Sequence, residues 1–288
     1  MILTRSLLFV PALNARALEK SKALDCDAVI LDLEDSIAPD RKVEARDTAI
    51  DALSAGGFAA PLRLVRVNSV ETDYFEGDIS ALANAGVDAI VIPKVSCAAD
   101  IQAALRILDA EPKAKDTQLW IMIETALGVM NLAEICAASP RLAGMIVGPN
   151  DLLKDLRANE TAGQEALLTS YGLCLLAARA YGLICIDGVY KHFKDTAGFA
   201  DNCAQGRRLG FDGKSLIHPG QIGPTNAAFG PSPDDIELAK RQIQAFEDAK
   251  DHGFGVATLD GALVEDLHVK SAHSLLEMAA AIAHKKDR

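Results

Sequence analysis

Eight short apolar segments recur along the first 217 residues, and this repetition constrains the fold more than any other feature. The segments are residues 6–10, 28–33, 62–67, 89–93, 119–124, 143–147, 183–187 and 211–217. They are rich in β-branched residues and mostly apolar on both faces, as the strands of a buried parallel sheet are. Stretches with helical spacing separate them, at residues 12–24, 39–55, 74–86, 98–109, 128–138, 164–181 and 195–209. Eight β/α steps predict an α/β protein with a (β/α)8 TIM barrel.

An open, doubly wound sheet is the alternative arrangement of alternating strands and helices. No GxGxxG sequence follows the first predicted strand, which argues against a dinucleotide-binding sheet. After about residue 230 the pattern changes to a long amphipathic helix, a short hairpin or turn, and a final helix. We therefore predict a barrel domain over residues 1–228 and a C-terminal helical extension over residues 229–288.

Charge and cysteine content narrow the class of protein. The formal net charge is −11, which argues against nonspecific binding to nucleic acid because such binding needs a basic surface. None of the six cysteines forms a CxxC pair, so we expect free, mostly buried thiols. An apolar stretch follows Arg5, but Pro11 breaks it, and no segment approaches the length of a membrane span. We expect a soluble cytoplasmic protein without a membrane partner.

Polar and charged residues follow the predicted strands where these end. In a TIM barrel the carboxyl ends of the strands form the functional face. The residues at these positions are Asp32, Glu34, Asp35, Arg66, Asn68, Lys94, Glu124, Asn150, Asp151, Asp187 and His218. Each has an ordinary explanation as a helix cap, an ion-pair partner or a loop residue. Their convergence on one rim indicates a functional site.

Glu124 and Asp151 end adjacent predicted strands, so their carboxylates can meet across one strand spacing. Two oxygen ligands with room for water are typical of Mg²⁺, and no His or Cys stands beside them at the spacing of a zinc site. Glu34 and Asp35 can reach the same ion through water. The pattern predicts a magnesium site.

Two cations accompany these acids on the predicted rim, Arg66 and Lys94. The acids would then face both a divalent metal ion and these positive charges. The rival interpretation is an acidic set without metal, neutralised by the two bases alone.

Several longer motifs are specific in combination. They are "RSLLFVPALNARALEKS", "VILDLEDSIAPDRKVEAR", "VRVN", "IVIPKV", "IMIETALGVMNL", "GMIVGPNDL", "GFDGKSLIHPGQI" and "DGALVEDLHVKSA". In this order they resemble the citrate lyase β-subunit and malyl-CoA lyase group of the HpcH/HpaI aldolase/citrate lyase superfamily, over nearly the whole chain. The resemblance implies a TIM barrel, bound Mg²⁺, and cleavage or formation of a C–C bond in a 3-hydroxyacyl-CoA thioester. A malyl-CoA, citramalyl-CoA or citryl-type ester would give a 2-oxo acid and acetyl-CoA or a homologue.

The resemblance also implies roles for single residues of the barrel. Glu124 of "IET" and Asp151 of "GPND" look like the metal ligands, and Arg66 of "VRVN" looks like the residue that binds the substrate carboxylate. Glu34 and Asp35 look like the carboxylates that support the metal. We expect Lys94 to contribute to substrate binding.

Two further roles follow from the resemblance alone. Arg5 resembles a position near the CoA phosphates. Many members have an aspartate after the C-terminal "GxMI" pattern that acts in a neighbouring subunit's site, and here Glu265 takes its position as the expected catalytic acid. This chain also has Ala12 where many members have glycine in the first turn. A shared site would require a homo-oligomer, a trimer or hexamer, unless the final helix simply covers its own barrel.

Other functions fit the same motifs. The site could hydrolyse the thioester, as a malyl-CoA thioesterase does, or belong to a citrate lyase β-like subunit whose substrate is carried by an acyl carrier protein. A non-catalytic binding protein on a barrel scaffold is the third alternative, and the presence of Glu124, Asp151 and Arg66 argues against it.

Overall fold

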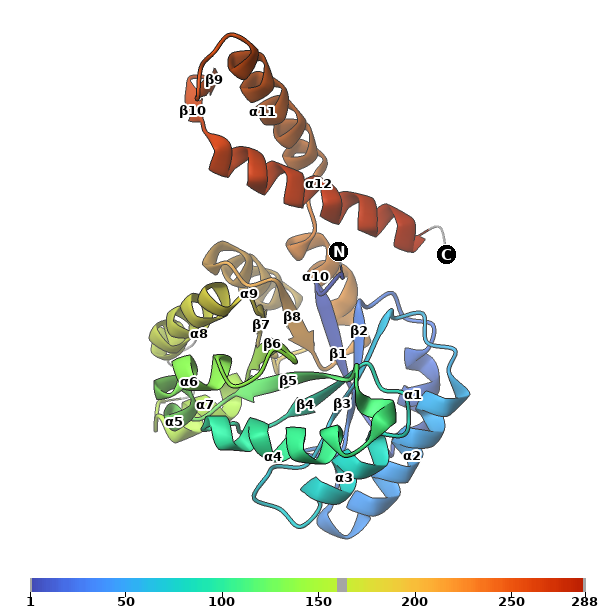
Figure 1. Ribbon diagram of the computed structural model, residues 1–288. Helices are drawn as coiled ribbons and strands as arrows, with labels where there is room; N and C mark the ends of the chain where they lie inside the picture. Colours follow the sequence, from blue (N-terminus) through green and yellow to red (C-terminus); the bar gives the residue numbers. More distant parts are fainter. Residues whose placement is uncertain (1, 160–164, 287–288) are drawn as a thin grey trace. The chain divides into compact units, whose positions relative to one another are not determined.

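The computed structural model describes residues 2–159 and 165–286 and contains a closed barrel of eight parallel strands (Figure 1). The strands are β1 (Ser6–Pro11), β2 (Ala28–Asp32), β3 (Leu62–Arg66), β4 (Ala89–Ile92), β5 (Gln118–Ile123), β6 (Leu142–Val147), β7 (Ile184–Asp187) and β8 (Gly213–Leu216). Each pairs with the next in parallel, and β8 returns to β1 with Ser6 opposite Lys214. The predicted TIM barrel is confirmed, and the open sheet is excluded.

Helices surround these strands (Figure 1). They are α1 (Ala15–Ser21), α2 (Lys42–Ala55), α3 (Phe75–Leu82), α4 (Ala98–Asp109), α5 (Ala126–Met130), α6 (Leu132–Cys136), α7 (Pro149–Asp155), α8 (Leu168–Tyr181) and α9 (Thr196–Leu209). Short 3-10 helices are η1 (Pro39–Arg41), η2 (Pro112–Ala114), η4 (Glu165–Leu167) and η5 (Pro219–Gln221). The predicted helix over 128–138 is two short helices, α5 and α6. Asp151 lies in the first turn of α7, a helix that the apolar pattern does not predict.

The interior of the barrel is packed with apolar side chains from its strands. Residues of this core cluster include Leu7, Ile30, Leu64, Val91, Trp120 and Ile146. The indole of Trp120 lies directly on the backbone of Gly144, where an added Cβ would stand 2.9 Å from two ring carbons. The large side chain on β5 therefore depends on the missing side chain on β6.

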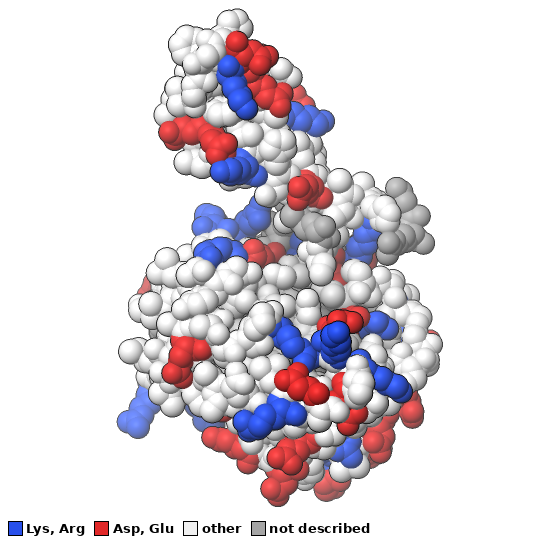
Figure 2. All heavy atoms as spheres, viewed as in Figure 1, with Lys and Arg blue, Asp and Glu red and all other residues white. Residues whose placement is uncertain are grey.

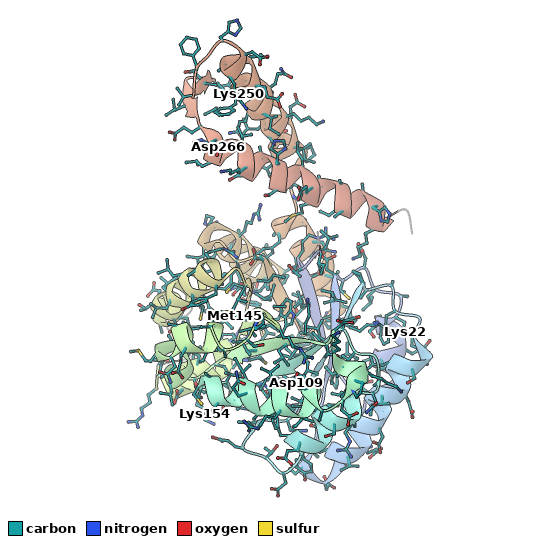
Figure 3. The ribbon with its side chains drawn as sticks, in the orientation of Figure 1. Lys22, Asp109, Met145, Lys154, Lys250 and Asp266 are labelled. Atoms are coloured by element: carbon teal, nitrogen blue, oxygen red, sulfur yellow. The ribbon has the colours of Figure 1, made fainter. Side chains whose placement is uncertain are left out.

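A separate compact unit is formed by Met1–Leu3 with Asn226–Arg288, whereas Thr4–Thr225 form the barrel unit. Its elements are the end of α10 (Ile222–Phe229), α11 (Pro233–Asp251), β9 (Ala257–Leu259), β10 (Ala262–Val264) and α12 (Asp266–Lys286). Asp260 and Gly261 both have positive φ, 50° and 81°, and close the β9–β10 hairpin as a two-residue turn. Figure 3 labels Lys250 near the end of α11 and Asp266 at the start of α12.

The cysteines agree with the expectation of free, mostly buried thiols. All six cysteines are free, and five are buried. On the face seen in Figure 2, acidic and basic side chains lie interspersed over the barrel. Within residues 2–159 and 165–286, none of the helices has the length and apolarity required to cross a bilayer.

Candidate active site

A cavity of about 320 Å³ opens where the barrel strands end. Its lining comprises Phe9, Pro11, Asp32, Asp35, Ser36, Arg66, Met122, Glu124, Val147, Gly148, Pro149, Asn150, Asp151, Val189, Ser215 and Ile217. Five of these residues are charged, four carboxylates against one guanidinium. The cavity is therefore a place of excess negative charge inside a largely apolar wall, and a bound cation would be favoured there.

Arg66 is held in the cavity wall by Asp32. The two residues are direct partners in the β2–β3 register, and Arg66 donates from Nε and Nη2 to the two Asp32 oxygens at 2.7 and 2.8 Å. Its guanidinium also lies over the Phe9 ring, 4.8 Å from the ring centre. Burial alone would lower the pKa of Arg66, but Asp32 and the neighbouring acids outweigh burial and raise this pKa above its ordinary value. Arg66 therefore stays a cation. One edge of the guanidinium is thus already occupied, which the sequence does not reveal.

Glu34 and Asp35 complete an ion-pair network with Arg66 and Lys94. Arg66 Nη1 lies 3.1 Å from Glu34 Oε2 and 3.2 Å from Asp35 Oδ2. Lys94 Nζ pairs with Glu34 Oε1 and lies 3.6 Å from Asp35 Oδ1. Burial raises the pKa of Glu34. The structure brings these four predicted residues together, and Asp35 and Arg66 line the cavity itself.

Lys94 connects this network to Glu124 through its backbone. Its φ of 54° is a left-handed conformation, uncommon for a residue with a side chain. In this conformation its N–H donates to Glu124 Oε1 at 2.8 Å while its ammonium group pairs with Glu34. One residue thereby fixes two carboxylates of the site.

Glu124 and Asp151 line the same cavity. Glu124 follows β5 and is only 1% exposed, and its Oε2 lies against the Cα of Gly148, where an added Cβ would stand 2.2 Å away. Burial, together with the charge of Asp151, raises the pKa of Glu124 to about 7. The structure therefore buries a carboxyl group beside a second one, an arrangement that is costly without a cation.

These residues fit Mg²⁺. Proteins commonly hold this ion through one or two carboxylates and leave its other positions to water and substrate oxygens. No three His, Cys, Asp or Glu side chains converge into a larger ligand set in the described part of the chain. Glu124 and Asp151 supply a two-carboxylate set of this kind, with oxygen ligands and no sulfur or imidazole.

We expect the metal-free protein to lose stability as the pH rises from about 4.5 to about 7. Glu124 titrates near 4.5 when unfolded and near 7 when folded, so in this interval only the folded state holds its proton. By linkage, about 3 kcal/mol of unfolding free energy is fully present below the lower pKa and lost above the higher one. The measurement is the free energy of unfolding in urea, for the chelator-treated wild type and for Glu124→Gln, at several pH values across this range. A difference between the two proteins that does not change with pH would contradict the assignment.

Arg5 lies away from the candidate cavity. It precedes β1, at the end of the strand opposite to the cavity. Its side chain is buried, and it donates from Nε and Nη2 to the two oxygens of Asp27, each at 2.8 Å. The guanidinium forms an ion pair there and does not line the cavity, and its role near the CoA phosphates stays a prediction.

Other predicted rim residues also lie away from the cavity lining. Asp187 pairs with Lys214 Nζ at 2.6 Å, Asn68 donates to Asp78 at 2.7 Å, and the His218 ring stacks on Phe193. Successive side chains of a strand point to opposite faces, so Asp187 points out of the barrel because Ile186, the residue before it, faces the barrel core.

Glu265 belongs to the C-terminal unit, between β10 and α12. Its backbone N–H donates to His268 Nδ1 at 3.0 Å, so the local turn is well held. Its role in a neighbouring subunit's site stays a prediction.

Comparisons with known proteins identify the family and similar folds. The model of the HpcH/HpaI aldolase/citrate lyase family matches residues 5–219. A (3S)-malyl-CoA thioesterase of Cereibacter sphaeroides (strain ATCC 17025 / ATH 2.4.3) is 50% identical over 279 residues, covering 97% of this chain and 95% of the relative. Citrate lyase subunit beta of Escherichia coli (strain K12) is 35% identical, covering 96% and 93%. The crystal structure of CitE from Mycobacterium tuberculosis in complex with magnesium, acetoacetate and coenzyme A is 28% identical, with a TM-score of 0.79 over 96% of this chain and 98% of that one.

Proposed function

Because the chain belongs to the HpcH/HpaI aldolase/citrate lyase family, we propose that its barrel is an enzyme domain acting on a malyl-CoA-type thioester with Mg²⁺. The reaction we assign first is hydrolysis of the thioester. Cleavage of the C–C bond in the same 3-hydroxyacyl group is the second candidate. Both reactions use one substrate class, a 3-hydroxyacyl-CoA whose acyl group ends in a free carboxylate.

One observation carries the substrate class: the buried Glu124, the half-buried Asp151 and the guanidinium of Arg66 line the same cavity. Glu124 and Asp151 provide cation ligands, and Arg66 provides a permanent positive charge for a carboxylate. The magnesium complex of the Mycobacterium tuberculosis relative supports the choice of ion. The 50% identity to a (3S)-malyl-CoA thioesterase supports hydrolysis over C–C cleavage.

The residues of the cavity would divide the work of binding. Glu124 and Asp151 would hold Mg²⁺, which when bound polarises a coordinated oxygen as a Lewis acid. Arg66 keeps Nε and one Nη2 hydrogen on Asp32 and donates from Nη1 to Asp35 at 3.2 Å. It would therefore meet the substrate carboxylate with the second Nη2 hydrogen, and with Nη1 in place of its bond to Asp35. Glu34 and Asp35 hold Arg66 and Lys94 in position for this contact.

The two candidate reactions break different bonds. In hydrolysis, water adds to the thioester carbonyl carbon, the C–S bond breaks, and the CoA thiolate takes up a proton, leaving a 3-hydroxy dicarboxylic acid. In C–C cleavage, the proton of the C3 hydroxyl leaves and the bond between C3 and C2 breaks. C3 leaves as the carbonyl carbon of the 2-oxo acid, and the remaining thioester enolate is then protonated at C2. The second reaction needs an acid at the enolate, and Glu265 of a neighbouring copy in a trimer or hexamer is the residue predicted for it.

An assay that follows two products separately decides between them. We expect purified protein with Mg²⁺ and (3S)-malyl-CoA to release free thiol without a 2-oxo acid. A 2-oxo acid with acetyl-CoA and no thiol would replace hydrolysis by the lyase reaction. Activity that appears only when the acyl group is carried on an acyl carrier protein would identify a citrate lyase β-like subunit. Inactivity on every ester, with or without carrier, would reject the enzymatic proposal.

A further inference from the structure

A second buried ion pair lies outside the cavity, between β7 and β8. Lys214 is completely buried, and no other lysine among the described residues is buried. Its Nζ donates to Asp187 Oδ2 and to the Gly188 carbonyl, each at 2.6 Å. Neither Lys214 nor Asp187 lines the cavity. A buried charge pair with no access to substrate needs another explanation.

The pair fixes the backbone of the loop that follows β7. Asp187 Oδ1 accepts the Gly188 N–H at 2.8 Å, and the Asp187 carbonyl accepts the Ser215 hydroxyl at 3.0 Å. Lys214 holds the Gly188 carbonyl from the other side. The Gly188 N–H and carbonyl oxygen are therefore both held by this one ion pair, and the next residue, Val189, forms part of the cavity wall.

Gly188 in turn lies directly against the turn that carries the proposed metal ligand. A Cβ added to Gly188 would stand 2.2 Å from Pro149 Cδ and 2.7 Å from the Val147 carbonyl. Pro149 begins α7, and Asp151 lies in its first turn. Packing this close leaves the Pro149 turn little room to move independently of Gly188.

We infer that the Asp187–Lys214 ion pair is a positioning device for the metal site: it holds Gly188 against Pro149 and so places Asp151 opposite Glu124. The inference rests on the proposed function, since it presumes that Glu124 and Asp151 hold a cation. Supporting residues that orient ligands commonly change metal affinity ten- to a hundredfold when replaced. Lys214 and Asp187 thus act through the backbone and touch neither substrate nor metal.

The test is Mn²⁺ binding to the full-length protein, followed by electron paramagnetic resonance with no substrate present. We expect Lys214→Met to weaken Mn²⁺ binding about tenfold or more. The control is Arg5→Met, which opens a doubly hydrogen-bonded, largely buried pair next to Lys214. The Arg5 carbonyl accepts the Lys214 N–H at 2.9 Å, but the Arg5 guanidinium binds Asp27 and not Gly188. This variant should lower the melting temperature similarly and leave the Mn²⁺ dissociation constant within about twofold of the wild type.

A second variant covers the case in which Lys214→Met does not fold. Gly188→Ala leaves the ion pair intact but pushes on Pro149, and it should also weaken Mn²⁺ binding about tenfold. If either folded variant binds Mn²⁺ as the wild type does, or if Arg5→Met weakens binding equally, the inference is overturned. A wild type that binds Mn²⁺ but turns over no ester would refute the proposed function while leaving the positioning role intact.

Discussion

Glu124→Gln and Asp151→Asn should each lower kcat/KM at least about a thousandfold, a loss of about 4 kcal/mol in transition-state stabilisation. Both changes keep the shape of the side chain and remove one anionic ligand from the cavity. An ion held by these two carboxylates alone would lose half of its protein ligands in either variant. Mn²⁺ binding should fall with activity, which separates loss of the ion from loss of the fold.

The double variant sharpens this test. Because the two carboxylates would act as one unit on one ion, removing both should cost little more than removing either. Asp155→Asn is the matched control, a carboxylate further along the same helix that accepts the Ala126 N–H at 2.6 Å outside the cavity lining. It should leave kcat/KM within about threefold of the wild type, a change of less than about 0.7 kcal/mol. Additive losses in the double variant, or full activity in either single variant, would contradict the metal assignment.

Glu124→Gln has an opposite effect on the metal-free fold. Burial beside Asp151 makes the ionised Glu124 carboxylate unfavourable, as its raised pKa of about 7 records. The neutral amide avoids that cost above this pH, so the inactive variant should be the more stable protein. A carboxylate that binds a metal ion is expected to lower the stability of the metal-free protein in this way.

The barrel was predictable because its strands are buried on both faces. A strand inside a TIM barrel contacts side chains on one face and helices on the other, so its apolar run is continuous and visible in one sequence. The acids and bases of the rim were predictable for a related reason. A charged residue directly after such a run, as Asp32 and Glu124 are, must lie where the buried strand ends.

Contacts that depend on register and on strand direction were not predictable. Asp32 meets Arg66 only because β2 and β3 pair with these residues opposite each other, and the sequence does not state that register. Lys214 stands inside the buried strand β8, and no local pattern shows that Asp187 opposes it. The position of Arg5 was predictable, because a residue that precedes the first strand lies at the end opposite to the rim.

Arg66→Lys should lower kcat/KM for a malyl-CoA-type ester about a hundredfold although it keeps the positive charge, a loss of about 2.7 kcal/mol. Lysine cannot reproduce the paired bonds to Asp32, so it would leave part of a buried carboxylate unsatisfied and displace the charge that meets the substrate. An ester without the distal carboxylate, such as 3-hydroxybutyryl-CoA, has no contact with Arg66 to lose. Its kcat/KM should therefore fall much less.

Arg63→Lys is the control that makes this result specific. Arg63 lies on the same strand and forms the same kind of paired bond, to Asp88 at 2.9 and 3.0 Å, but it does not line the cavity. Its replacement should lower the melting temperature slightly and leave kcat/KM unchanged within about twofold, under about 0.5 kcal/mol. Equal losses on both esters in Arg66→Lys would assign Arg66 to the structure of the rim alone. Because Asp32 and Asp35 already accept hydrogen bonds from the guanidinium, only selectivity between the two esters can show that Arg66 also binds a substrate carboxylate.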